Sequence, residues 1–194
     1  TSDFRMICRQ LWLSVGAWYA VSMVRGSPNP RHFGLPARLR RAGRHSGLTR
    51  MALAQKAGVS TATALYAATG QRLPTVASVA RLAAGLAVSA GWLAYGLGVM
   101  TNCGPSATCD GMGARLQAMR IERGLTKAAL ARLADLSPSA FAKIENGGQT
   151  GIDVLEALAQ ALGVSPGWLA FGVGPQVLPS RRRSRQLAQP AEPE

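Results

Sequence analysis

The sequence predicts an all-α chain made of two tandem five-helix units. Ala, Leu, Gly and Arg dominate the composition and β-branched runs are scarce. Apolar residues recur at helical spacing, and one long segment occurs twice along the chain. The chain has 194 residues, of which 47% are hydrophobic, and this is enough for two small domains with apolar cores.

The internal repeat sets the expected domain boundaries. Residues 34–60 align with residues 111–137 without gaps at an offset of 77, and residues 86–98 align with residues 162–174 at an offset of 76. This period is too long for a solenoid, so each copy is interpreted as one small domain. The expected parts are an N-terminal extension (1–33), a first unit (34–98), a linker (99–110), a second unit (111–174) and a basic disordered tail (175–194).

The second unit begins with two expected helices. Apolar residues lie on one face of a helix over 112–122, which Gly124 ends. Thr126 is a favourable N-cap for a helix over 127–134. The two patterns together predict a pair of short amphipathic helices with a tight connection.

Three further patterns complete this unit. Ser137 caps a third helix, whose first residue is Pro138 and which ends at Asn146. An apolar stripe predicts a fourth helix over 152–162, and Ser165 starts a short fifth one. The first unit follows the same pattern, and its helices are expected over 35–45, 49–57, 60–68, 75–85 and 89–95.

The charge is unevenly distributed along the chain. The net charge is +13, which favours a polyanionic partner, either nucleic acid or an anionic membrane surface. Residues 34–98 hold eight basic residues and no acidic one, whereas residues 111–174 hold six basic and five acidic residues. We therefore expect the electrostatic contact with a polyanion to lie mainly on the first unit.

The composition also excludes several classes of function. Three Cys and two His are too few for a disulfide scaffold or an array of zinc fingers, and no metal site or cofactor is expected. Aromatic residues make up only 6%, which disfavours a stacking platform for single-stranded nucleic acid. No glycine-rich phosphate loop, paired acids or nucleophile–base motif is present, so we expect no enzyme.

The second unit carries a recognisable motif, T-x3-L-A-x5-S-x3-F-x2-I-E-N-G, over residues 126–147, followed by L-G-V-S-P-x-W-L over residues 162–169. It resembles the Cro and repressor-type helix-turn-helix family, also called XRE-like. The resemblance implies two lambda-repressor-like domains, the first of them degenerate. It also implies that the third helix of a unit enters the DNA major groove, which is wide enough for a helix.

The resemblance carries over to particular positions. Residues at the start of the second helix contact phosphate or bases in this family, usually as Gln, and Arg50 and Lys127 stand there in this chain, which favours phosphate contact. The predicted DNA-binding residues are Lys127, Pro138, Ser139, Ala140, Ala142, Lys143 and Asn146 in the second unit, and Arg50, Thr61, Ala62 and Tyr66 in the first.

A second set of residues is expected to hold the motif together. In this family an Arg of the first helix pairs with a Glu of the third, and the matching residues are Arg120 and Glu145. The first unit has Gly43 and Ala68 at these positions, so both partners are absent together.

The small side chains of Ala54 and Ala131 suit a close crossing of helices two and three. Gly58 supplies the left-handed conformation needed at the turn, and Asp135 replaces it in the second unit.

We interpret the chain as a cytoplasmic, sequence-specific regulator of transcription that binds double-stranded DNA, and as a repressor that occupies an operator. The second unit is expected to read the sequence, while the basic first unit holds phosphates. The alternative is a protein–protein adapter or antitoxin-like module that keeps the fold without specific DNA reading. The sequence leaves self-association open. It also leaves open whether both units engage DNA or pack through their fifth helices and hide a recognition helix.

The N-terminal extension contains an apolar stretch, Leu11–Val24, that resembles the core of a signal peptide but is short for a membrane span. We interpret the segment before Met23, residues 1–22, as translated sequence upstream of the native start or as the edge of a fragment, with an extra packing helix or a membrane anchor as alternatives. Membrane attachment is not expected.

Overall fold

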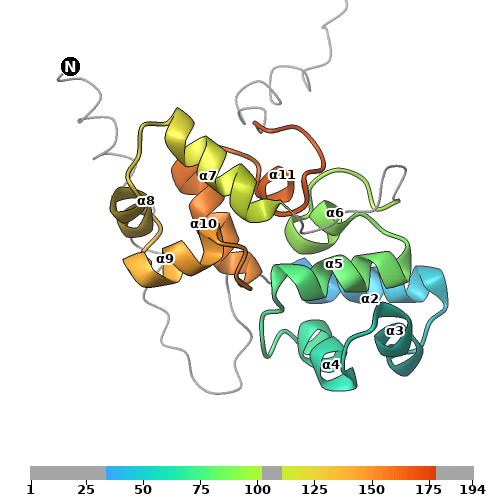
Figure 1. Ribbon diagram of the computed structural model, residues 1–194. Helices are drawn as coiled ribbons and strands as arrows, with labels where there is room; N and C mark the ends of the chain where they lie inside the picture. The colour runs from blue at the N-terminus through green and yellow to red at the C-terminus, as the bar shows by residue number, and fades with distance from the viewer. Residues whose placement is uncertain (1–33, 102–110, 178–194) are drawn as a thin grey trace, which may run out of the picture.

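The computed structural model describes residues 34–101, the N-terminal half, and residues 111–177, the C-terminal half (Figure 1). Its regular structure in these ranges is helical, with two isolated β-bridges, so the all-α prediction is confirmed. In the described ranges, no helix has the length and apolar character needed to cross a bilayer. The stretch Leu11–Val24, most of the basic tail and most of the expected linker lie outside them.

Five helices lie in each half. Those of the N-terminal half are α2 (Gly34–Ser46), α3 (Arg50–Ala57), α4 (Thr61–Thr69), α5 (Val76–Leu86) and α6 (Ala90–Tyr95). Those of the C-terminal half are α7 (Met112–Glu122), α8 (Lys127–Leu133), α9 (Pro138–Glu145), α10 (Ile152–Leu162) and α11 (Pro166–Phe171).

Side-chain caps determine where most of these helices begin. Thr49 and Ser60 cap α3 and α4, and Thr126 and Ser137 cap α8 and α9; each hydroxyl accepts a backbone N–H from the first turn. Four helices of the N-terminal half begin one residue later than expected, because the predicted ranges counted the cap residue as helical.

The buried faces of the helices form one continuous hydrophobic core that runs through both halves. In the N-terminal half α5 packs against α3, and α4 packs against α2 and α3. In the C-terminal half Phe141, Leu155, Leu158 and Leu169 are fully buried. Because one core joins the halves, the division into two domains stays a prediction.

The halves contact each other through α6 and α11. Gly91 and Gly167 bring the two helices together, and the rings of Tyr95 and Phe171 lie 6.5 Å apart. The hydroxyl of Tyr95 also donates to the carbonyl oxygen of Ile152 at 3.2 Å. The packing through the fifth helices, which the sequence left open, is therefore present.

Candidate nucleic-acid interface

The C-terminal half presents two helices joined by a tight turn, α8 and α9. Asp135 in this turn has φ +56°, and Gly58 at the matching place between α3 and α4 has φ +62°. An Asp tolerates the left-handed region better than most residues, so the turn keeps its form without glycine. Ala131 and Ala54 are buried, and both helix pairs are in contact.

One face of α9 is buried and the other is open. Phe141, Ile144 and Glu145 point into the molecule. The predicted DNA-binding side chains lie on the other side: Pro138, Ser139, Lys143 and Asn146 are exposed, and Ala140 and Ala142 are half-exposed. The structure therefore brings these six residues together on one accessible surface, the α9 face.

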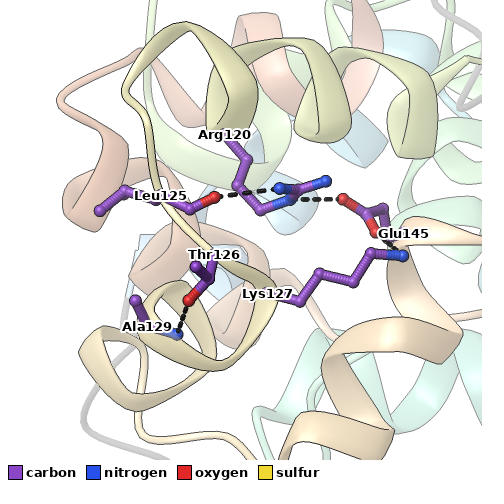
Figure 2. A network of polar contacts seen from close by, with 6 residues as sticks. All are labelled: Arg120, Leu125, Thr126, Lys127, Ala129 and Glu145. Atoms are coloured by element: carbon purple, nitrogen blue, oxygen red, sulfur yellow. Dashed lines mark hydrogen bonds and ion pairs between the residues drawn. The ribbon is translucent and has the colours of Figure 1, made fainter.

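A buried ion-pair network holds α9 against α7 and α8 (Figure 2). Arg120 Nε donates to Glu145 Oε1 at 2.8 Å, and Arg120 Nη1 donates to the carbonyl oxygen of Leu125 at 3.0 Å. Lys127 Nζ lies 2.6 Å from Glu145 Oε2, outside hydrogen-bonding angles, so this contact is an ion pair. The network links three helices at the back of the α9 face.

The electrostatics of this network favour the ionised carboxylate. Burial by itself would raise the pKa of Glu145, but the hydrogen bond from Arg120, the close contact with Lys127 and the positive charges of both residues outweigh burial and lower the pKa. The Glu145 side chain is only 2% exposed and that of Arg120 11% exposed. Each therefore depends on the other for charge compensation.

Lys127 has a role that the sequence reasoning missed. It was expected to contact phosphate, whereas its ammonium group is paired with Glu145, although the side chain remains 52% exposed. A comparison of the two repeats could have indicated this pairing. Glu145 and Lys127 both differ from their counterparts in the first repeat, which are Ala68 and Arg50. The same pairing therefore cannot form in the N-terminal half.

An open pocket of about 720 Å³ takes the place of this network in the N-terminal half. Its lining includes Gly43, Arg50 and Ala68, which correspond to Arg120, Lys127 and Glu145. Arg40 Nη1 donates to the carbonyl oxygen of Ala68 at 3.0 Å across it. The charged network has thus been replaced by small residues and three arginines, Arg40, Arg44 and Arg50.

The predicted contact residues of the N-terminal half also lie on the surface. Arg50, Thr61, Ala62 and Tyr66 are exposed. The guanidinium carbon of Arg72 lies 5.8 Å from the centre of the Tyr66 ring, within reach of a cation–π contact. The helix α4 itself carries no charged side chain, whereas the α9 face carries Lys143.

Seven of the eight basic residues in the N-terminal half are exposed, namely Arg40, Arg41, Arg44, Arg50, Lys56, Arg72 and Arg81. Arg38 is the exception, because it donates to the carbonyl oxygens of Leu93 and Ala94 at 2.9 and 2.7 Å. Burial lowers the pKa of Arg38, while the charge of Glu156 opposes that shift. Arg115 makes the equivalent bonds to Leu169 and Ala170, so both arginines fasten a fifth helix.

Gly113 lies where α7 approaches the end of α9. A Cβ on Gly113 would collide with the carbonyl oxygen of Glu145, which is backbone and cannot rotate away. We expect Gly113→Ala to destabilise the protein by about 1–3 kcal/mol through overpacking. Gly43→Ala is the matched control, because nothing lies within 4 Å of its Cβ position, and it should stabilise by about 0.5–1 kcal/mol. Thermal melts of both variants check this, and equal shifts would contradict it.

Comparison with known families supports a helix-turn-helix protein. Residues 112–170, which span α7 to nearly the end of α11, match the model of a helix-turn-helix domain. The match lies within the C-terminal half and identifies neither a subfamily nor a second copy. Comparison with curated proteins and with solved structures gives no match.

Proposed function

We propose that the chain is a cytoplasmic transcriptional regulator of the XRE-like kind that binds specific sites in double-stranded DNA and acts as a repressor. The observation that carries the proposal is the α9 face, an exposed polar surface on the second helix of a helix pair whose domain matches a DNA-binding family. The proposal assigns the chain no catalytic step. Blocking an operator requires only occupancy of the site.

The chemistry of the α9 face fits base recognition. The major groove is about 12 Å wide and admits one helix. The ammonium of Lys143 suits the O6 and N7 acceptors of guanine, and the hydroxyl of Ser139 can donate to or accept from either base of a pair. Ala140 and Ala142 offer methyl groups to thymine. The ion-pair network behind α9 fixes the orientation from which these groups reach the bases.

The N-terminal half supplies phosphate affinity in this proposal. It carries seven exposed basic residues, and its sequence from 34 to 98 contains no acidic residue. Phosphate contacts are insensitive to sequence and strengthen binding through release of counterions. Arg50 keeps the phosphate contact that was expected of both Arg50 and Lys127, because Ala68 leaves no carboxylate to pair with it.

A second candidate function has one observation in its favour. Met51, Leu65 and Tyr66 are exposed to 72%, 38% and 39%, so α3 and α4 present large apolar side chains to solvent among their polar ones. An exposed apolar surface is typical of protein contacts. This favours an adapter or antitoxin-like module in which the N-terminal half binds a protein.

Selection of bound duplexes from a random library by the full chain, at about 150 mM salt, separates the two functions. The regulator requires a recurring sequence motif among the bound duplexes. Binding without enrichment of any motif, or no binding at all, would contradict sequence-specific regulation and favour the adapter.

The phosphate contacts predict a distinct salt dependence. Arg50→Ala should reduce the slope of log affinity against log salt by about 0.9, the value for one phosphate contact on B-DNA, without changing the selected motif. Arg123→Ala is the charge-matched control, because its guanidinium lies beside Gly163 at the end of α10. Titrations at several salt concentrations measure both slopes. An unchanged slope for Arg50→Ala would place this residue away from the DNA.

A further inference from the structure

The contacts between the two halves join residues that occupy equivalent positions in the repeat. At the offset of 76, Thr75 corresponds to Gly151, Gly91 to Gly167 and Tyr95 to Phe171. Thr75 and Gly151 form an isolated antiparallel bridge. A Cβ on Gly167 would lie 3.7 Å from the Cα of Gly91, and the rings of Tyr95 and Phe171 are 6.5 Å apart.

Contact between equivalent residues is the mark of twofold symmetry, because a residue on the axis of an isologous interface meets its own counterpart. Three such pairs define an axis that passes between α6 and α11 and between the starts of α5 and α10. In Figure 1, α9 lies to the left of α10 and α4 lies below α5, so both helices are on the outside of the molecule, away from the contact of α6 with α11.

We propose that the chain is a covalent pseudodimer, in which α4 and α9 enter two successive major grooves on one face of the same duplex. This inference rests on the proposed function and specifies its partner. Dimers of helix-turn-helix proteins bind half-sites about 34–36 Å apart, one turn of DNA. A single chain with an internal twofold axis presents two such helices without a second copy.

Some contacts between the two halves have no symmetric counterpart, which indicates that the two halves of one chain pair with each other. The hydroxyl of Tyr95 bonds to Ile152 of the other half, whereas its counterpart Phe171 has no hydroxyl. The half-buried Glu156 interacts with Arg38 across the halves, and its counterpart is Ala80. Contacts that are not reciprocated suit a fixed pair of unlike halves better than exchange between identical chains.

The pseudodimer requires an asymmetric target. Position for position, α9 presents Ser139 and Lys143 where α4 presents Ala62 and Tyr66. The half-site under α9 should therefore be well specified. The half-site under α4 should be weakly specified, with binding there coming mainly from phosphates and apolar contacts.

The test uses the full chain and its selected duplex, with changes made only in the DNA so that the fold is untouched. We expect one chain per duplex by analytical ultracentrifugation and a footprint over two half-sites one turn apart. Inserting five base pairs between the half-sites turns them to opposite faces and should weaken binding about 100-fold, as expected for lost bivalency. The same insertion outside the site is the control and should have no effect.

The outcomes separate the pseudodimer from the proposed function. Two chains per duplex, or a single half-site whose binding ignores the internal insertion, would overturn the pseudodimer while sequence-specific binding stands. Absence of any selected motif would overturn the proposed function and the pseudodimer with it.

Discussion

Glu145→Ala is expected to lower the free energy of unfolding by about 3–5 kcal/mol, the usual cost of breaking a buried ion pair from one side. The substitution removes the carboxylate that accepts from Arg120 at 2.8 Å and leaves a guanidinium with an 11% exposed side chain without its counter-charge. Lys127 adds little to the loss, because its half-exposed ammonium can be solvated. Urea unfolding of the full chain measures the change.

The N-terminal half supplies the control for this prediction. It lacks both partners, with Gly43 and Ala68 at the positions of Arg120 and Glu145. A variant that combines Arg120→Met with Glu145→Leu should accordingly lose less stability than Glu145→Ala alone, because no charge is left buried. A loss below about 1 kcal/mol for Glu145→Ala would place the pair among surface salt bridges.

Acid should remove the same contribution. The folded-state pKa of Glu145 is lowered, while an unfolded glutamate titrates near about 4.3. The carboxylate therefore adds stability in full above the unfolded pKa, and this is lost as pH falls through the lowered folded pKa. The difference in unfolding free energy between wild type and Glu145→Gln should be largest near pH 6 and shrink below about pH 4. A difference that is constant with pH would contradict this.

The double substitution Ser139→Ala with Lys143→Ala is expected to weaken binding to the selected DNA by about 1–3 kcal/mol, roughly 5- to 150-fold. Both side chains are exposed on the α9 face and neither contributes to the core. Affinity for duplexes of unrelated sequence should change far less, because most phosphate contacts remain. Fluorescence anisotropy with selected and scrambled duplexes measures both affinities.

Arg123→Ala controls for the lost charge in this experiment. It removes one positive charge at a position beside α10 rather than on the α9 face, and it should leave the preference for the selected duplex unchanged. Equal losses on selected and scrambled duplexes in the double variant would show that α9 contributes charge alone.

The sequence predicted those features that depend on residues close together in the chain, such as the starts of helices. Thr126 and Ser137 begin α8 and α9 because capping depends on residues three positions apart. The partnership of Arg120 with Glu145 came from the family resemblance, and the structure places the two in contact. The third member, Lys127, lies far from Glu145 in sequence, and only the packing of α8 against α9 brings its charge to the carboxylate.

Two other features needed tertiary information. Arg38 was counted among the basic residues for phosphate, yet it binds the end of α6 as Arg115 binds the end of α11. An Arg at the same place in both repeats was the available signal. The sequence did not decide whether the two halves pack against each other. Gly91 and Gly167 allow α6 and α11 to approach closely, but glycine at these positions indicates a contact only once the two helices are seen side by side.

Base recognition by α9 is the central feature of the proposed function. The most direct test repeats the duplex selection with Lys143→Ala and with Arg123→Ala and compares the motifs with that of the wild type. We expect Lys143→Ala to lose the preference at one base pair of one half-site and to keep the rest, while Arg123→Ala keeps the whole motif. An identical motif from wild type and Lys143→Ala would show that α9 does not read bases through Lys143.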